Sequence, residues 1–342
     1  MPRRAEQASP APTDPTWAFH PCTPALREDL ACLSAPWLRD IAWLLHAPDM
    51  ARLNVSGRPT LTELGLADDT ARRRWLAALA PQREAFLQHL DQRRSQRLGI
   101  YHEALWQWIL GAAPHSTLLG HNLTLRDGKR ITGELDLLYR YRGVEPATIE
   151  HAELAIKFFL GLERGPGDRH DAARWIGTGS LDSLAIKCHR LAQRQLPAAR
   201  DEPGQAVREA LVPSAALHQR IIMPGFLYHP WDQRLALPDL ANPDVYQGLW
   251  CHQRAWPTLC AALPTATRGQ VLLKPQWLAP PRGAGLALAA LGQLLERHFA
   301  TTPSPLHLRL TLPDGRSCRL FVVMDGWPPA LPLPPRDAPS AH

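Results

Sequence analysis

The chain has 342 residues, and its 38 basic and 32 acidic residues give it a net charge of +6. Its hydrophobic content of 45% is sufficient for a sizeable core, in one large domain or in two smaller ones. The longest apolar run, around residues 284–295, is too short to span a bilayer, and no apolar stretch follows the basic N-terminus as it would in a signal peptide. We therefore expect a cytoplasmic protein without a membrane partner.

The six cysteines are scattered and include no Cys-x-x-Cys pair, which predicts reduced thiols rather than disulfides. The excess of positive charge permits the binding of a polyanion such as DNA or RNA, but it does not require one. The sequence gives no indication of the oligomeric state.

The N-terminal part of the chain is predicted to be helical. Residues 1–14 are rich in Pro, Ala and charge, which is typical of a disordered tail. Apolar residues recur at helical spacing in residues 36–45 and 61–90, within a helical region that we place at residues 15–96.

The central region, residues 97–230, is predicted to contain a helix, three strands, a second helix and a fourth strand. Asp127-Gly128 is a strong hairpin signal between the first two strands. The predicted elements are a helix at 97–110, strands at 118–126, 129–140 and 148–160, a helix at 181–196 and a strand at 220–228.

A C-terminal α+β extension is predicted for residues 231–327, followed by a Pro-rich tail at residues 328–342. The extension is expected to contain a helix at 246–259, a strand at 270–278, a helix at 286–299 and a hairpin at 306–324 that turns at Asp314-Gly315.

Two of the central strands carry charged residues although their pattern predicts burial. Side chains two residues apart share one face of a strand, so Glu134 and Asp136 point to one side of the second strand. By the same rule Glu153, Ala155 and Lys157 share one face of the third. Charged groups are rarely buried unless they are paired or bind a metal. These strands therefore predict a metal-dependent hydrolytic site.

The order of the central elements, with an acid on the second strand and an acid and a lysine on the third, resembles the PD-(D/E)XK nuclease superfamily. From residue 37 to residue 327 the chain also resembles the domain-of-unknown-function family 1853, a bacterial group placed in that superfamily. The resemblance implies an α/β fold with a restriction-endonuclease-like αβββαβ core. The motifs that carry it are LGIYHEAL at 98–105, GELD at 133–136, ELAIKFFLG at 153–161, GLW at 248–250 and QWL at 276–278.

The resemblance also assigns a catalytic centre. Cleavage of a phosphodiester needs an activated water and a positive charge at the phosphate, and Mg²⁺ or Mn²⁺ bound by carboxylates supplies both. Asp136 would be the central metal ligand and Glu153 the second. Lys157 would orient or deprotonate the attacking water, or stabilise the phosphate in the transition state.

Three further residues are assigned auxiliary roles by the same resemblance. Glu103, on the helix before the sheet, would be an accessory acid, and Gln193 or Gln195, on the helix after the third strand, would contact the substrate backbone. From the residues alone, Glu103 is equally compatible with a solvated charge, and the two glutamines with ordinary surface positions.

One departure from the superfamily pattern affects the predicted activity. The acid is normally two residues before the lysine, but here that position is Ala155 and Glu153 lies one pleat further along, about 6.5 Å away. A metal at Asp136 could still reach Glu153 if the strands are staggered, and Glu134 could compensate. Alternatively, Glu153 and Lys157 form a structural salt bridge.

Two functions are therefore predicted. The first is a metal-dependent nuclease acting on DNA or RNA. The alternative is a catalytically inactive protein of nuclease fold that binds nucleic acid or another protein.

Overall fold

The computed structural model describes residues 14–91, 97–143, 148–274, 276–329 and 331. The predicted N-terminal tail, apart from Asp14, and most of the predicted Pro-rich tail lie outside these residues. Within the described part of the chain, no helix is both long and apolar enough to cross a membrane.

Five helices come first in the chain, and strands interspersed with shorter groups of helices follow. The helices are α1 (Pro24–Ala31), α2 (Pro36–His46), α3 (Asp69–Ala78), α4 (Arg83–Asp91), α5 (Leu98–Ala112), α6 (Leu184–Arg190), α7 (Glu202–Leu211), α8 (Trp256–Ala261) and α9 (Leu288–Phe299). The strands are β1 (Ser116–Asp127), β2 (Arg130–Tyr141), β3 (Thr148–Leu154), β4 (Lys157–Gly161), β5 (Trp175–Gly177), β6 (Ala216–Ile222), β7 (Gly225–Pro230), β8 (Tyr246–His252), β9 (Arg268–Val271), β10 (Leu286–Ala287), β11 (Leu306–Thr311) and β12 (Ser317–Val323). Short helical turns are η1 (Pro15–Ala18), η2 (Ala80–Gln82), η3 (Ala172–Arg174), η4 (Leu191–Gln195), η5 (Pro197–Ala199) and η6 (Gln253–Ala255), of which η4 is a π-helix that continues α6.

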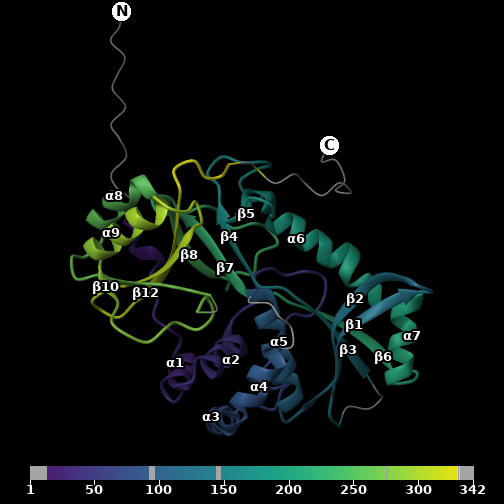
Figure 1. The fold of residues 1–342 in the computed structure, drawn as a ribbon. Helices are drawn as coiled ribbons and strands as arrows, with labels where there is room; N and C mark the ends of the chain where they lie inside the picture. The colour runs from purple at the N-terminus through teal and green to yellow at the C-terminus, as the bar shows by residue number, and fades with distance from the viewer. Residues whose placement is uncertain (1–13, 92–96, 144–147, 275, 330, 332–342) are drawn as a thin grey trace, which may run out of the picture.

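The strands form two mixed sheets in an α/β fold. The smaller sheet has the order β1-β2-β3-β6, and the larger has the order β10-β9-β11-β12-β8-β7-β4-β5. In Figure 1 the small sheet and α7 lie at the right, α1–α5 gather at the bottom, and α8 and α9 lie at the upper left. Strands of the predicted central region and of the predicted C-terminal extension share the larger sheet, because β7 pairs with β8 in parallel.

Local sequence signals explain several boundaries. Gly128 has a φ of 57° in the turn between β1 and β2, and Gly315 has a φ of 85° between β11 and β12, so both predicted hairpins are confirmed. The Ser183 hydroxyl accepts a hydrogen bond from the Ile186 amide (3.2 Å) and caps α6. Pro81 lies in η2 and separates α3 from α4 within the predicted helix at residues 61–90.

The largest correction concerns the predicted third and fourth strands, each of which is two strands in two different sheets. The chain leaves the small sheet after β3 and enters the large one at β4, and β6 and β7 repeat this step alongside. The amide of Ala155 donates to the Ile222 carbonyl (3.0 Å), which joins the two breaks. A Cβ atom on Gly225 would overlap the Lys157 carbonyl oxygen, so a glycine is needed where β7 approaches β4.

Two further predictions at the C-terminal end are wrong. The predicted helix at residues 246–259 is β8 followed by the short η6 and α8, and the predicted strand at residues 270–278 ends at Val271. β8 lies in the interior of the large sheet, and four of its residues are buried in succession, so the alternation that marks a strand is absent.

The main core lies between the N-terminal helices and the sheets. Nine successive residues of α2 are buried, which places this helix in the interior. The hydrophobic cluster that contains α2 also includes side chains of α5, such as Trp106 and Ile109, and residues of β2, β4 and β7. The N-terminal helices therefore pack against both sheets and hold them as one body.

Candidate active site

The backbone register brings Asp136 and Glu153 together. β2 and β3 are antiparallel, with Leu137 opposite Ala152, so the next pair along is Asp136 and Glu153. The Leu154 amide donates a hydrogen bond to Asp136 Oδ2 (2.8 Å) and fixes this carboxyl at the end of β3. The predicted stagger is therefore present, and the two acids lie side by side.

Ala155 does not face the carboxyl pair. It lies in the two-residue break between β3 and β4, where it is 7% exposed and packs in an apolar cluster with Phe159 and Leu227. An acid at this position would enter the core, whereas Glu153 faces Asp136.

Both carboxylate oxygens of Glu153, which is fully buried, accept hydrogen bonds. His151 Nε2 lies 2.9 Å from Oε1, and Gln195 Nε2 donates to Oε2 (2.7 Å). Burial lowers the pKa of His151 to about 4, so its ring is neutral near pH 7 and the hydrogen bond is not an ion pair. Gln219 Nε2 lies 3.3 Å from His151 Nδ1, which leaves Nε2 as the protonated nitrogen that donates to Glu153.

Two lysines lie at the site, and only one was predicted. Lys187 of α6 donates to Gln195 Oε1 (3.1 Å), and its charge acts on both Asp136 and Glu153. Burial, reinforced by the neighbouring Lys157, lowers the pKa of Lys187. The predicted Lys157 instead donates to Asp182 Oδ2 (2.7 Å), so the alternative of a Glu153–Lys157 salt bridge is wrong.

The two acids hold their protons unusually tightly. Burial first, and then the charge of Glu153, raise the pKa of Asp136 to about 7. Burial also raises the pKa of Glu153 to about 7, against the opposing effects of its hydrogen bonds and of Lys187. Two adjacent, poorly solvated carboxylates repel each other when both are ionised, and a divalent cation between them removes that penalty.

This donor set fits Mg²⁺ or Mn²⁺. These hard cations are commonly held by one or two carboxylates, with waters and substrate oxygens completing the shell. Asp136 and Glu153 would supply the carboxylate oxygens. In the described part of the chain, no group of three or more His, Cys, Asp or Glu side chains is arranged to hold a metal, so the protein offers a pair of ligands rather than a closed cage.

Among the remaining predicted residues, Gln195 contacts the acid pair and the others lie apart from it. Asn122 Nδ2 donates to Glu134 Oε1 (2.9 Å) and lies 3.3 Å from Glu103 Oε2, so Asn122 links Glu103 to Glu134. Glu134 is exposed. Gln193 is exposed on η4, whereas Gln195, two residues later, contacts Glu153.

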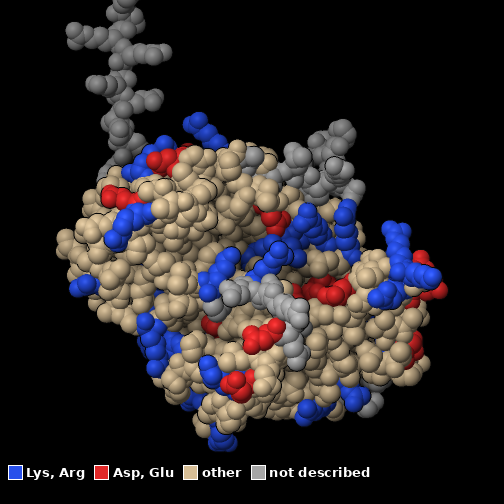
Figure 2. Space-filling view, in the orientation of Figure 1, with Lys and Arg blue, Asp and Glu red and all other residues tan. Residues whose placement is uncertain are grey.

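A cavity of about 330 Å³ lies at Lys157. Lys157, Asp182 and Trp277 are among the residues that line it, and Lys274 Nζ lies 4.9 Å from the centre of the Trp277 ring. The face shown in Figure 2 carries a band of Lys and Arg side chains over the region of α6, next to a patch of acidic side chains. The cavity that Lys157 lines therefore combines positive charge with an aromatic surface.

Comparison with known proteins identifies a family and no characterised relative. Residues 39–323 match the family described as "Domain of unknown function (DUF1853)", which covers more than half of the chain. The chain therefore belongs to this family, as its motifs indicated. No curated protein and no solved structure shows a significant match.

Proposed function

We propose that this member of the DUF1853 family is a Mg²⁺- or Mn²⁺-dependent phosphodiester hydrolase that acts on DNA or RNA, with a restriction-endonuclease-like core. The observation that carries the proposal is the pairing of Asp136 with Glu153 across β2 and β3. The order α5, β1, β2, β3, α6, β6 supports the proposed core, because it follows the helix–strand order on which the resemblance rests, with β4, β5 and α7 inserted into it.

The side chains around the carboxyl pair suit phosphodiester hydrolysis. A bound cation would activate a water and neutralise charge on the phosphate. Lys187, whose pKa is lowered by burial, is suited to exchange a proton with the attacking water or with the leaving oxygen. Lys157, held by Asp182, adds a fixed positive charge where the phosphate backbone would enter. Gln195 and His151 orient Glu153 and exclude water from its inner side.

The neighbouring cavity would receive the nucleotide next to the scissile phosphate. Trp277 offers a partly buried aromatic face, and Lys274 lies over the ring. Stacking of a base on an aromatic side chain does not depend on sequence, which is consistent with a hydrolase of low sequence specificity.

One observation favours the alternative of a protein that binds without cleaving. Both oxygens of Glu153 already accept hydrogen bonds, and Lys157 is drawn to Asp182, so the groups nearest the acid pair are satisfied without a metal. Under this alternative, the basic face and the cavity bind nucleic acid and the carboxyl pair is structural.

The test is incubation of the full chain with single- and double-stranded DNA and RNA, in Mg²⁺, Mn²⁺ or EDTA. The Asp136→Ala and Lys157→Ala variants run alongside, with Glu134→Gln, an exposed acid on the same strand as Asp136, as the matched control. We expect cleavage that needs the metal, falls at least about 100-fold in Asp136→Ala and survives in Glu134→Gln.

Two results would contradict the proposal. One is cleavage that is unchanged by both alanine substitutions, which would indicate a contaminating nuclease. The other is the absence of cleavage of every substrate with either metal. In the second case, salt-dependent binding of the same substrates, measured by fluorescence anisotropy, would support the binding protein instead.

A further inference from the structure

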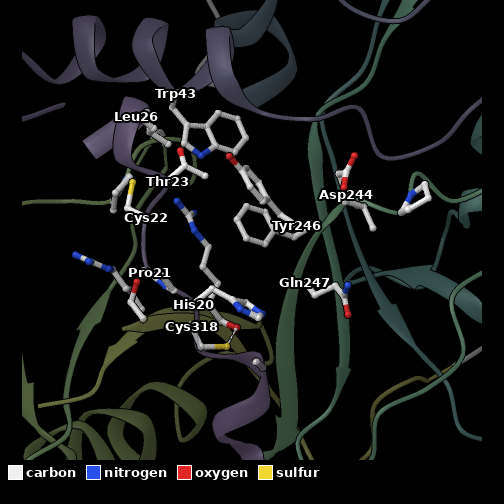
Figure 3. Close-up of a pocket in the computed structure, with 18 residues that line it drawn as sticks. His20, Pro21, Cys22, Thr23, Leu26, Trp43, Asp244, Tyr246, Gln247 and Cys318 are labelled. Carbon is white, nitrogen blue, oxygen red and sulfur yellow. Dashed lines mark hydrogen bonds between the residues drawn. The ribbon is translucent and has the colours of Figure 1, made fainter. Parts of the chain in front are cut away.

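A second cavity, of about 340 Å³, lies where the N-terminal segment before α1 meets the large sheet (Figure 3). Its walls come from residues 18–26, from Trp43 of α2, from strands β7 and β8, and from the hairpin of β11 and β12. None of the residues that line it belongs to the candidate active site. Cavities of this size and mixed lining are typical of sites for small molecules.

One wall of this cavity is aromatic. Trp43 and Phe226 lie nearly parallel, with ring centres 6.3 Å apart and an interplanar angle of 7°. Tyr246 of β8 completes the wall, 5.8 Å from Trp43 and 5.1 Å from Phe226. In Figure 3, Trp43 and Tyr246 come from different elements and approach each other at the edge of the same open space. A flat apolar ring would find an extended contact surface here.

Two arginines, Arg309 and Arg319, also line the cavity. Arg319 is only 6% exposed, and its guanidinium lies 4.9 Å from the centre of the Phe226 ring. It donates to the carbonyl oxygens of Trp277 (2.5 Å) and Leu278. Burial lowers its pKa to about 10, and the charge of Arg309 acts in the same direction.

Arg309 has an unused hydrogen-bond donor. Its Nη1 donates to the Pro281 carbonyl (3.2 Å), but its Nε is buried and has no hydrogen-bond partner among the residues that the structure describes. A buried guanidinium nitrogen without an acceptor is costly, and such groups usually have a partner in the functional state of a protein.

Among the described residues, Arg39, Arg282, Arg309 and Arg319 form no ion pair with a carboxylate. Arg39 and Arg282 do not line the cavity, and both donate to the Leu33 carbonyl. Asp244 lines the cavity but is exposed. Asp40 is buried and acts on Arg39 and Arg319 through its charge; it accepts hydrogen bonds from Tyr101 and Ala279, and burial raises its pKa to about 7.

A structural role accounts for part of this arrangement. The arginines anchor residues 277–282 to α2, to Leu33 and to the sheet through backbone carbonyls. Carbonyl oxygens satisfy donors but do not cancel the charge, and buried charges are generally paired. The cavity that Arg309 and Arg319 line is also left unexplained by an anchoring role.

We propose that this cavity binds a small anion joined to a flat apolar ring, with its carboxylate or phosphate group at Arg309 and Arg319 and its ring against Trp43 and Tyr246. The site is independent of the proposed hydrolase centre. Binding of a small molecule in this cavity does not depend on the carboxyl pair on β2 and β3.

The test is isothermal titration calorimetry of the full chain with two anions and their uncharged counterparts. Adenosine 5′-monophosphate is compared with adenosine, and indole-3-carboxylate with indole-3-carboxamide. We expect saturable binding of at least one anion with a Kd below about 1 mM, at least about tenfold tighter than its neutral counterpart. Whether the phosphate or the carboxylate binds identifies the anionic group, and either outcome supports the proposal.

Three variants locate the binding. Arg309→Met should weaken anion binding at least about tenfold, whereas Arg297→Met, an exposed arginine on α9, should leave it unchanged. Thr23→Trp fills the mouth of the cavity from an exposed position and should block binding without removing a charge. Circular dichroism and melting temperature establish that each variant is folded.

The proposal is overturned if neither anion binds below about 1 mM. It is also overturned if Arg309→Met binds as Arg297→Met does. If Arg309→Met does not fold, the Thr23→Trp variant decides, because unchanged binding in that variant places the ligand elsewhere.

Discussion

Replacement of Asp136 by Asn is expected to stabilise the fold at about pH 8 and to abolish binding of a divalent cation. Asn keeps a side-chain oxygen that accepts the Leu154 amide hydrogen bond, but it removes one of two adjacent charges. A residue whose loss improves stability and removes binding is retained for function. A purely structural role for Asp136 predicts the opposite change in stability.

The size of this effect follows from the pKa of Asp136. Burial and Glu153 raise it from 3.8 to about 7. Each pKa unit corresponds to about 1.4 kcal/mol, so about three units set an upper limit of roughly 4 kcal/mol on the cost of ionising this group in the native state. Asp136 keeps some exposure and Lys187 offsets part of the repulsion, so we expect a gain of about 1–2 kcal/mol in the free energy of unfolding.

The sign depends on pH. The native pKa of Asp136 lies above the unfolded value, so the native state retains a proton that the unfolded chain releases. Stability from this group is fully present below about pH 4 and is lost as the pH rises through about 7. The advantage of Asp136→Asn is therefore expected at about pH 8 and should disappear at about pH 4.

Urea unfolding in EDTA measures the stability of the variant and of the wild type at both pH values, and titration calorimetry measures Mn²⁺ binding. Glu134→Gln is the matched control, because this acid lies on the same strand and is exposed, and its substitution should change stability by less than about 0.5 kcal/mol. Loss of stability in Asp136→Asn at about pH 8, or binding of Mn²⁺ with wild-type affinity, would refute the reasoning.

Three further predictions concern the pair, the lysine and the core. Both carboxyls must release their protons to bind a cation, so Mn²⁺ affinity by calorimetry should rise by up to about 100-fold per pH unit below about pH 7 and then level off; a flat profile contradicts this. Lys187→Met should lower kcat at least about 100-fold in a steady-state cleavage assay, whereas Arg190→Met on the same helix should not, and equal rates would remove Lys187 from the site. Arg72 forms an ion pair with buried Asp29 (2.7 Å), so Arg72→Met should lower the free energy of unfolding, measured in urea, by about 3–5 kcal/mol. The more exposed ion pair of Arg73 with Glu28 is the comparison, and Arg73→Met should lower the free energy of unfolding by less than about 1 kcal/mol. Similar losses in the two variants would show that burial does not determine the size of the effect.

The sequence was sufficient to predict the residues of the acid pair because alternation along a strand is a local property. Asp136 and Glu153 each follow from a period of two within β2 and β3, and Asp127-Gly128 sets the hairpin. Element types from α5 to β3 were predicted for the same reason, since each has a strong apolar pattern of its own.

The break between β3 and β4 was not predictable in this way. Residues 148–160 are almost all buried, so they have the appearance of one interior strand. Their division depends on β6 and β7, which break at the matching point about 70 residues later and carry the chain into the second sheet. A pairing between distant segments of this kind leaves no mark on the local sequence.

Lys187 and His151 were missed as site residues for a related reason. Lys187 lies on a short helix whose pattern gives no preference for that position, and its charge acts on the acids only because α6 packs against β5 and against Ala155 and Phe159. His151 has no zinc-like spacing, so the sequence does not indicate it as a site residue. Its role as the hydrogen-bond partner of Glu153 depends on burial, which spacing does not report.

We propose that the Asp136–Glu153 pair supports metal-dependent cleavage of nucleic acid, and one rate comparison tests this role. It measures the initial rates at which the wild type and Asp136→Asn cleave a mixed pool of labelled single- and double-stranded DNA and RNA in Mn²⁺. We expect a wild-type rate at least about 100-fold higher than that of a folded Asp136→Asn. Equal rates, or no cleavage by the wild type, would show that the pair does not have this role.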